Sequence, residues 1–401
     1  MSLDFTHACQ FLFPRVAGGT TYSLGPTRAL LDRLGHPEQH YPTILIGGTN
    51  GKGSVAVLVY ETLREAGFST ALYTSPHLVD VRERMLVDGR PITREAFAMW
   101  TDRLHDAILE EQASFFEATT AMAFADFAAR GADVAVIEVG LGGRLDSTNV
   151  LDPVVSAVTY VGLEHTEYLG DTLDQIAREK AGIAKRGRPF VIGEPDPGRA
   201  ALMAELGRAV GAEVMIVPPT ARYGGELALL GAHQRRNAAV AGAVLAALPA
   251  EIRPSDDAAR RAFARARLPG RFERRDKWIF DVAHNADGME VLVETLRETA
   301  PPRPIHALVS VLADKNWTTM LEGLTGAVDR VWATMAPTAP APRRWDLGTV
   351  AHRFAGRVTV EPDFDRALRD VQEGARTVVV CGSFHTVGDA MARLPGLAPL
   401  G

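Results

Sequence analysis

The feature that most constrains the fold is a glycine-rich stretch that follows an apolar run near the start of the chain. Residues 43–46 have the composition of a buried strand, and residues 55–66 have the pattern of a helix. Between them lies the sequence Gly48-Thr49-Asn50-Gly51-Lys52-Gly53-Ser54. A strand, a glycine loop and a helix form a common phosphate site, because glycines let backbone N–H groups approach the anion and the helix N-terminus carries partial positive charge. The stretch therefore predicts an α/β fold with a phosphate-binding loop.

The polar side chains of this loop suit a nucleotide phosphate. Lys52 is placed to reach the terminal phosphates, and the hydroxyl of Thr49 or Ser54 is placed to meet Mg²⁺. The usual pattern has Ser or Thr directly after the Lys, whereas here Gly53 intervenes. On the loop pattern alone, a glycine turn without a ligand is the alternative.

Composition narrows the class of protein. The 401 residues are 46% hydrophobic and 23% charged, which is ordinary for a globular chain long enough for two domains. A net charge of −6 gives no sign of a general nucleic-acid surface, no apolar run approaches membrane-spanning length, and no signal peptide is evident. With only 2 Cys, a disulfide framework or a cysteine-rich zinc site is not expected. We therefore expect a cytoplasmic enzyme, without nucleic-acid or membrane partners. We also expect a monomer that acts on small molecules, which composition does not establish.

Strand and helix patterns alternate along the whole chain. In the first part, we expect strands at 43–46, 69–74, 133–139, 154–161, 190–193 and 214–217, and helices at 27–34, 55–66, 97–111, 117–130, 172–184, 233–248 and 256–266. After an interruption at residues 268–271, we expect strands at 278–282, 305–311, 330–334, 358–360 and 377–381, and helices at 287–299 and 365–374. The alternation predicts two mostly parallel sheets covered on both faces, with a domain boundary near residue 269.

Polar side chains follow the predicted strands of the first domain. Ser75, Glu138 and His165 stand at or near strand ends, and Lys180 lies on the next helix. Because the carboxyl ends of parallel strands meet at one edge, these side chains should lie near the glycine loop. A hydroxyl, a carboxylate and an imidazole can hold a divalent ion, although a His is an unusual ligand for Mg²⁺.

Each of these residues also has a simpler structural explanation. Ser75 could start a turn, and Glu138 could form a salt bridge with Arg144. His165 could be a hydrogen-bonded loop residue, and Lys180 could lie on a solvated helix face.

The second domain and the use of lysine add further candidates. Asp281 and His284 follow a predicted strand, where Asp281 could instead bond the local backbone. Only five of the 43 basic residues are Lys. A lysine retained in an Arg-rich chain is a candidate for a role that guanidinium cannot fill, which draws attention to Lys52 and Lys180.

Several further blocks follow the glycine loop along the chain. They are Ser75-Pro76-His77-Leu78, Phe116-Glu117-Ala118-Thr119, Glu138 through Gly140-Leu141-Gly142-Gly143-Arg144-Leu145-Asp146 to Thr148-Asn149, Glu164-His165-Thr166, Arg178-Glu179-Lys180-Ala181-Gly182-Ile183, Leu268-Pro269-Gly270-Arg271, Phe280-Asp281-Val282-Ala283-His284-Asn285 and Cys381-Gly382-Ser383-Phe384-His385. The loop and these blocks, taken together and in this order, resemble the folylpolyglutamate synthase and dihydrofolate synthase family of the Mur ligase superfamily. In that family, Gly53 is part of the loop's own pattern.

The resemblance implies a fold and a reaction. The fold is a phosphate-loop, mostly parallel sheet domain that binds ATP, over residues 1–268, followed by a smaller Rossmann-like glutamate ligase domain over residues 269–401. The enzyme would be an ATP-dependent carboxylate–amine ligase that uses Mg²⁺. It would phosphorylate a folate or dihydropteroate carboxylate and let the amine of L-glutamate attack the acyl phosphate, serving as both dihydrofolate synthase and folylpolyglutamate synthase. The alternatives are a folylpolyglutamate synthase alone or another Mur-type amide ligase.

The resemblance also implies residue roles. For catalysis they are Lys52, Lys180 and His284; for ATP they are Thr49, Asn50, Gly51, Lys52, Gly53, Ser54, Asn237, Arg271 and Asp281. For Mg²⁺ they are Ser75, Glu138, His165 and Lys180, the last as a carbamate. For the pterin they are Phe116, Glu117 and Thr119, and for glutamate they are Ser383 and His385.

Three other functions compete with this interpretation. A murein-precursor ligase would carry a nucleotide-sugar domain before the loop, for which the 47 residues before Gly48 are too few. A phosphate-loop kinase would not need the block around Asp281 and His284. A non-catalytic nucleotide-binding regulator would not need Lys180 or the metal candidates. ADP release that depends on glutamate would favour the ligase.

Overall fold

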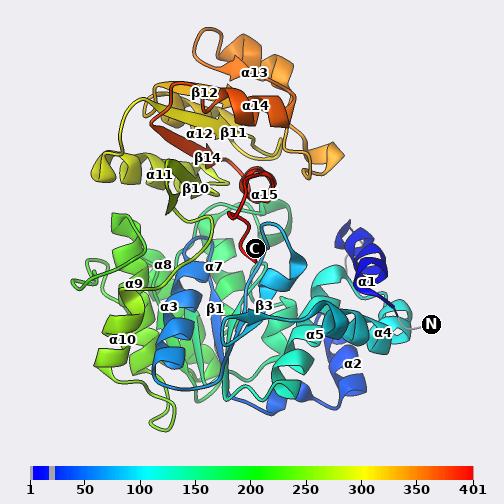
Figure 1. The fold of residues 1–401 in the computed structure, drawn as a ribbon. Helices are drawn as coiled ribbons and strands as arrows, with labels where there is room; N and C mark the ends of the chain where they lie inside the picture. Colours follow the sequence, from blue (N-terminus) through cyan, green and yellow to red (C-terminus); the bar gives the residue numbers. More distant parts are fainter. Residues whose placement is uncertain (1–2, 18–22, 401) are drawn as a thin grey trace. The chain divides into compact units, whose positions relative to one another are not determined.

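The computed structural model describes residues 3–17 and 23–400, whose contacts form two compact units (Figure 1). The first unit comprises residues up to Pro76, Arg82–Leu227 and Arg235–Ala266. The second comprises His77–Val81, Ala228–Gln234 and the chain from Arg267 onward. Two short segments from earlier in the chain, His77–Val81 and Ala228–Gln234, thus belong to the second unit. A single domain boundary near residue 269 does not assign these segments to it.

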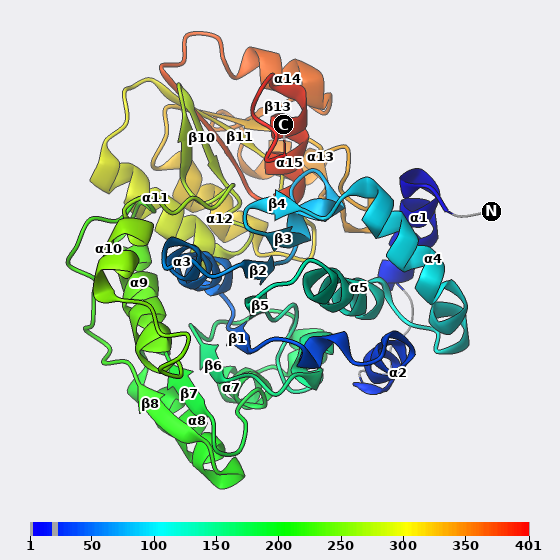
Figure 2. The same cartoon turned by 60° about the horizontal axis from the view of Figure 1, so that its bottom comes forward.

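The first unit contains one eight-stranded sheet in the order β4-β3-β2-β5-β1-β6-β7-β8 (Figure 2). Six strands run parallel: β1 (Thr43–Gly47), β2 (Thr70–Tyr73), β5 (Val134–Glu138), β6 (Val155–Val158), β7 (Pro189–Ile192) and β8 (Glu213–Ile216). Two short antiparallel strands, β3 (Met85–Val87) and β4 (Arg90–Pro91), extend one edge. In the register, Ile46 lies opposite Glu138 and Gly47 lies opposite Val158, so the carboxyl ends of β5, β1 and β6 meet where the glycine loop begins.

The central strands of this sheet are buried on both faces, because helices cover the sheet on both sides. The helix after the glycine loop, α3 (Lys52–Glu65), packs against β1, β2, β5 and α10. The other helices are α1 (Phe5–Leu12), α2 (Gly25–Leu34), α4 (Arg94–Glu110), α5 (Phe115–Ala129), α6 (Thr166–Leu169), α7 (Leu173–Ala181), α8 (Pro197–Val210), α9 (Ala232–Ala246) and α10 (Asp256–Phe263). Short 3₁₀ turns lie at Phe13–Ala17, Pro37–Gln39, Val81–Arg84 and Ser147–Val150.

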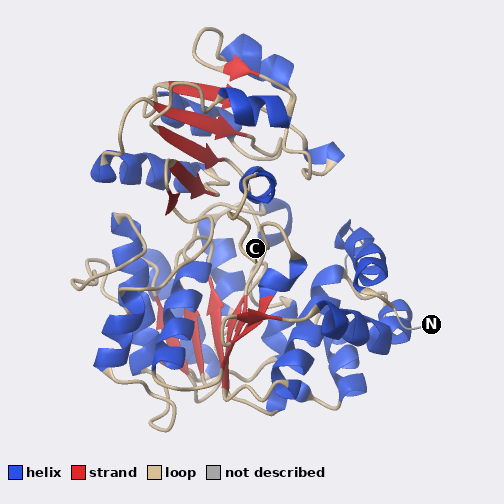
Figure 3. Cartoon of the chain, viewed as in Figure 1, coloured by secondary structure: helices blue, strands red, loops and turns tan. Residues whose placement is uncertain are grey.

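The second unit contains a six-stranded sheet in the order β13-β12-β11-β14-β10-β9. Figure 3 shows helices packed against this sheet. Its strands are β9 (Glu273–Arg275), β10 (Trp278–Asp281), β11 (Ile305–Val309), β12 (Arg330–Ala333), β13 (Thr359–Val360) and β14 (Thr377–Cys381), of which β9 alone pairs antiparallel within this sheet. Its helices are α11 (Ala286–Thr299), α12 (Trp317–Thr325), α13 (Leu347–Arg353), α14 (Phe364–Asp370) and α15 (Phe384–Arg393), with a 3₁₀ turn at Ala341–Arg343.

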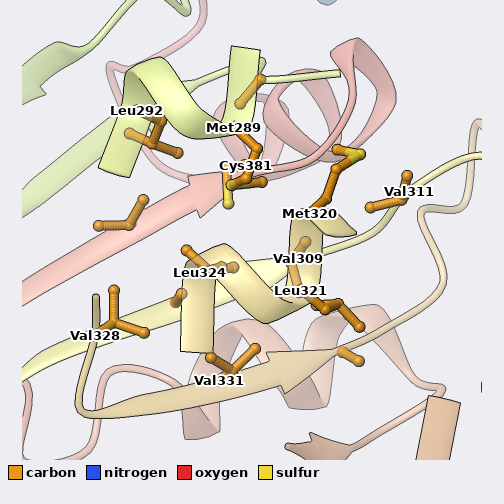
Figure 4. Packing of buried hydrophobic residues seen from close by; sticks show 14 of the residues in the cluster. Met289, Leu292, Val309, Val311, Met320, Leu321, Leu324, Val328, Val331 and Cys381 are labelled. Carbon is orange, nitrogen blue, oxygen red and sulfur yellow. The ribbon is translucent and has the colours of Figure 1, made fainter. Parts of the chain in front are cut away.

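Alternating strand residues divide the core of the second unit into two clusters. Val379 and Cys381 of β14 pack with α11, α12 and α13 on one face, which Figure 4 shows around Val309 and Met320. Val378 and Val380 pack with α14 and α15 on the other face. Because side chains alternate along a strand, burial on both faces explains why this strand is a continuous apolar run.

The predicted α/β fold class is confirmed, and the differences from the predicted elements have local causes. The strand expected to continue to residue 161 ends at Val158, because the next residues bond to the glycine loop and to a side chain. The helix expected at 172–184 begins after its predicted N-cap, Thr172, but ends at Ala181. The short strands β3, β4 and β9 and the helices α1, α6, α8, α12, α13 and α15 were not predicted. Within the described ranges, no helix is both long and apolar enough to cross a bilayer.

Candidate active site

The glycine loop adopts the strand–loop–helix arrangement that its sequence predicts. Gly51 has a left-handed backbone, with φ 86°, and stands as the N-cap of α3. An L side chain rarely adopts this conformation, which explains the glycine. Lys52 is the first helical residue, and its Nζ donates to the carbonyl oxygens of Gly48 at 2.9 Å and Thr49 at 3.0 Å. The lysine therefore lies folded over the loop, beside the helix N-terminus.

The loop is held from the neighbouring strand. Thr159 Oγ1 donates to the carbonyl oxygen of Asn50 at 2.7 Å. The Thr49 hydroxyl accepts from the Gly162 N–H at 3.0 Å and donates to the Gly162 carbonyl at 3.2 Å. Both Thr49 and Ser54 are buried. The Thr49 hydroxyl thus has protein partners, and a role for it at Mg²⁺ stays a prediction.

Helix α9 brings the predicted ATP residue Asn237 beside the loop. A Cβ built on Gly51 would lie 2.6 Å from the Asn237 Oδ1. The side chain therefore fills the space that the glycine leaves open, and its contact with a nucleotide stays a prediction.

Two predicted metal ligands stand at the same corner of the sheet. The Ser75 N–H donates to Glu138 Oε2 at 3.2 Å, and Glu138, the last residue of β5, is 5% exposed. A Cβ built on Gly140 would lie 3.7 Å from the Ser75 Oγ, so the hydroxyl is close to the loop after β5. Arg144 pairs with Glu179 at 2.9 Å. The simpler explanation of Glu138 as the salt-bridge partner of Arg144 is therefore wrong.

Lys180 is buried, so the simpler explanation that it lies on a solvated helix face is also wrong. Its side chain is 1% exposed, and its Nζ donates to Glu164 Oε1 at 2.9 Å. Burial lowers the pKa of Lys180 to about 8. Burial alone would raise the pKa of Glu164, but the charges of Lys52 and Lys180 lower it to about 2. Lys52, Glu164 and Lys180 thus form one charge cluster at the glycine loop.

The chemistry of Ser75 and Glu138 fits a divalent cation. Both supply oxygen donors, which Mg²⁺ prefers. His165 follows Glu164 with a left-handed backbone, φ 47°, at the start of α6. In the part of the chain that the structure describes, no group of three or more His, Cys, Asp or Glu side chains could hold a metal. The predicted set contains only two such side chains, Glu138 and His165, so it falls outside groups of this size and stays a prediction.

In the second unit, Asp281 bonds the local backbone, as its simpler explanation requires. Its Oδ1 accepts from the Ala283 N–H at 2.9 Å and its Oδ2 accepts from the Phe272 N–H at 2.8 Å. Burial raises the pKa of Asp281 to about 6, against the opposing charge of Arg271. A nucleotide contact of this carboxylate is a further role, and it stays a prediction.

Arg271 and His284 both lie against Phe384. The Arg271 guanidinium is 5.0 Å from the centre of the Phe384 ring, and the His284 ring is 5.6 Å from it. His233 was not among the predicted residues; burial and the positive charge of Arg271 lower the pKa of His233 to about 4. Its only sequence signal was its place one turn before Asn237 on a predicted helix.

The predicted glutamate residues have protein partners. Ser383 is the N-cap of α15, and its hydroxyl accepts from the Thr386 N–H at 3.1 Å and donates to the Ser310 carbonyl at 3.0 Å. His385 Nδ1 lies 3.0 Å from the Thr338 hydroxyl, and burial lowers the pKa of His385. Their roles at glutamate stay predictions.

The three predicted pterin residues occupy different environments. Glu117 caps helix α5, since its carboxylate accepts from the Ser114 N–H at 2.7 Å. Thr119 is fully buried and donates to the Phe115 carbonyl at 2.8 Å. Phe116 is 39% exposed. Of the three side chains, only that of Phe116 is exposed, and the Arg84 guanidinium lies 5.5 Å from the centre of its ring. The roles of all three residues at a pterin stay predictions.

Comparison with known proteins decides the family. Residues 46–210 match the Mur ligase middle domain, and residues 270–384 match the Mur ligase glutamate ligase domain. The chain is 34% identical to a folylpolyglutamate synthase of Lacticaseibacillus casei, over 98% of this chain and 99% of the relative. The chain belongs to the folylpolyglutamate synthase/dihydrofolate synthase family.

Other members of the family agree over the full length of this chain. A probable bifunctional folylpolyglutamate synthase/dihydropteroate synthase of Halobacterium salinarum is 36% identical over 98% of this chain, but the chain spans about half of that relative, 52%. The Escherichia coli FolC structure in complex with DHPP and ADP has a TM-score of 0.88 at 29% identity, covering 98% of both chains. A bifunctional family member with Mn, AMPPNP and L-glutamate bound has a TM-score of 0.84 at 29% identity, again covering 98% of both chains.

Proposed function

We propose that this family member is an ATP-dependent ligase that adds L-glutamate to the carboxylate of a folate or dihydropteroate through an acyl phosphate. The observation that carries the proposal is the charge cluster of Lys52, Glu164 and Lys180 at the glycine loop, next to the oxygen donors of Ser75 and Glu138. The ligands of the related structures, which include ADP, DHPP and L-glutamate, support it.

The chain's own residues suit the chemistry of phosphoryl transfer. A carboxylate is a poor electrophile, and its phosphorylation supplies a leaving group. Negative charge on the transferred phosphoryl oxygens is stabilised by preorganised cations and N–H groups, which Lys52 and the N-terminus of α3 provide. When bound, Mg²⁺ would neutralise phosphate charge, and Ser75, Glu138 and His165 would hold it.

We assign Lys180 a carbamate as its working form. The unmodified amine pairs with Glu164, and its burial favours the neutral form that reacts with CO₂. A carbamate would present oxygens, which a cation prefers to an ammonium. In the second unit, Arg271 and Asp281 are proposed for ATP and His284 for catalysis. We further propose a cytoplasmic monomer.

The proposed reaction is tested by ATP-dependent incorporation of labelled glutamate, with dihydropteroate and a reduced folate as separate acceptors. The expected result is incorporation with both acceptors and ADP release that requires glutamate. Incorporation with the reduced folate but not with dihydropteroate would indicate that the enzyme is a folylpolyglutamate synthase without dihydrofolate synthase activity. ADP formation without any incorporation would contradict the ligase. Lys52→Ala, which removes the loop's cation, is the inactive control.

A further inference from the structure

The loop after β6 carries two residues of the proposed site and is bonded to the glycine loop on one side. It spans residues 159–165 and ends in Glu164 and His165. The Tyr160 carbonyl accepts from the Thr49 N–H at 2.6 Å. Two residues later, both backbone groups of Gly162 bond to the Thr49 hydroxyl. One side of the loop is therefore fixed to the element that would hold ATP.

The other side of the loop is fixed by a side chain. Strand β7 leaves the sheet after the Gly193 N–H donates to the Val158 carbonyl at 2.7 Å. A Cβ built on Gly193 would lie 2.8 Å from the Thr159 carbonyl oxygen, which explains the glycine at this departure. Beyond the ends of both strands, the Val161 N–H donates to Glu194 Oε2 at 2.7 Å. The carboxylate thus joins the segment after β7 to the loop after β6.

Glu194 is completely buried, with 0% exposure, and its second oxygen is fully used. Oε1 accepts from the Asp196 N–H at 3.0 Å and from Arg199 Nε and Nη2 at 3.2 and 3.0 Å. A buried ion pair can often be replaced by apolar side chains without loss of stability. An apolar side chain could not accept the Val161 N–H, however, so the carboxylate has a function at this position beyond filling the core.

We propose that Glu194 is a positioning residue: anchored by Arg199, it holds the Val161 amide and thereby fixes the loop that presents Glu164 and His165 beside the glycine loop. The inference rests on the proposed function for the role of that loop in ligation. The placement of the loop itself can be measured without any ligand.

The first test is Glu194→Gln, measured by amide hydrogen exchange of the ligand-free protein. The amide has the size of the carboxylate but one acceptor oxygen, so it cannot satisfy both the Val161 N–H and the Arg199 guanidinium. Loss of a hydrogen bond to a charged group should speed exchange of the amides of residues 160–164 by about tenfold. Exchange in the strands β1 and β5 should be unchanged.

The second readout is the Mg²⁺ dependence of ligation. Because the loop carries a proposed metal ligand, the Mg²⁺ concentration for half-maximal ligation should rise by about tenfold in Glu194→Gln. Metal-free ADP affinity should change little, since Thr159 and the N-terminus of α3 still hold the glycine loop.

Asp126→Asn is the matched control. Asp126 lies on α5, is 2% exposed and pairs at 3.2 Å with Arg130, the C-cap residue of that helix. This variant therefore also breaks an ion pair of the first unit whose carboxylate is buried. It should lower Tm without changing exchange at 160–164 or the Mg²⁺ response. A purely structural role of Glu194 predicts that Glu194→Gln, like the control, lowers Tm but leaves the Mg²⁺ response unchanged, and that result would overturn the proposal.

If Glu194→Gln does not fold, Glu194→Asp replaces it in both tests. The shorter side chain keeps the negative charge but moves the carboxylate oxygen away from the Val161 N–H. If both variants fail to fold, Glu194 is a determinant of the fold rather than of the loop, and the proposal is wrong. If the wild-type chain makes no amide, the proposed function fails, while faster exchange at 160–164 in the variant would still support the placement role.

Discussion

Replacing Lys180 by Arg separates the two roles that the structure allows for this buried amine. Arg keeps the charge that pairs with Glu164, but it cannot lose its proton or become a carbamate. The site has little room for the larger group, since Lys180 is 1% exposed and a Cβ built on Gly143 would lie 3.0 Å from its Cα. The overpacking should cost about 1–3 kcal/mol of unfolding free energy. Tm should therefore fall by about 2–4 °C for each kcal/mol lost.

The effect on ligation should be larger than the effect on stability. If oxygens from a carbamate stabilise the transition state, their loss should slow glutamate incorporation by about 10²-fold, which corresponds to about 3 kcal/mol. The assay is ATP-dependent incorporation of labelled glutamate at saturating Mg²⁺, below the Tm of the variant. If the ion pair with Glu164 is the whole role, Lys180→Arg should ligate nearly as fast as the wild type, and that result would refute the reasoning.

Two further variants control this experiment. Lys185→Arg makes the same chemical change at a partly buried lysine four residues beyond the end of α7, which donates to the Asn149 carbonyl at 3.0 Å, and it should keep full activity. Lys180→Ala should be inactive but recover part of its activity with acetate, whose oxygens can enter the vacated space. Acetate should not restore Lys180→Arg, because the guanidinium fills that space.

Three other outcomes follow from the geometry. Gly51→Ala should weaken ADP binding about tenfold by calorimetry, because a left-handed L residue costs about 1–2 kcal/mol and the new Cβ meets Asn237; unchanged binding would contradict this. Asp281 holds its proton up to about pH 6 when folded and to 3.8 when unfolded, so its contribution to stability should fall as pH rises from about 4 to 6. In urea unfolding, the wild type should lose up to about 3 kcal/mol relative to Asp281→Asn across that window, and a constant difference would be evidence against the raised pKa. Glu117→Ala and Ser114→Ala should each lower unfolding free energy by about 1 kcal/mol through the lost cap of α5. Neither should raise the KM for folate, and a rise in Glu117→Ala alone would assign Glu117 to the acceptor.

The sequence by itself determined the elements whose signals are local. The buried strand β1 and the presence of a helix after the glycine loop follow from consecutive residues, because apolar runs, glycines and capping residues act within one turn or one strand. The same is true of Thr172 as the N-cap of α7. The helix α3 nevertheless begins at Lys52, before the predicted residue 55. The alternation of such signals was enough for the α/β class with two sheets.

Short antiparallel strands were beyond these local signals. β3 has three residues and β4 has two, and each is a strand only because a neighbouring strand supplies its hydrogen bonds. Pairing of this kind depends on residues distant in sequence, which a local pattern does not contain.

Tertiary structure alone decided which polar side chains are buried and with which partners. Lys180 lies in the charged run Arg178-Glu179-Lys180, which is typical of a solvated helix face, yet it is buried beside Glu164 from another segment. Glu138 does not pair with Arg144, and Glu194 reaches the Val161 amide across the end of a strand. The physical reason is that the cost of burying a charge depends on the donors and acceptors that the fold brings around it, and these come from residues far apart in the chain.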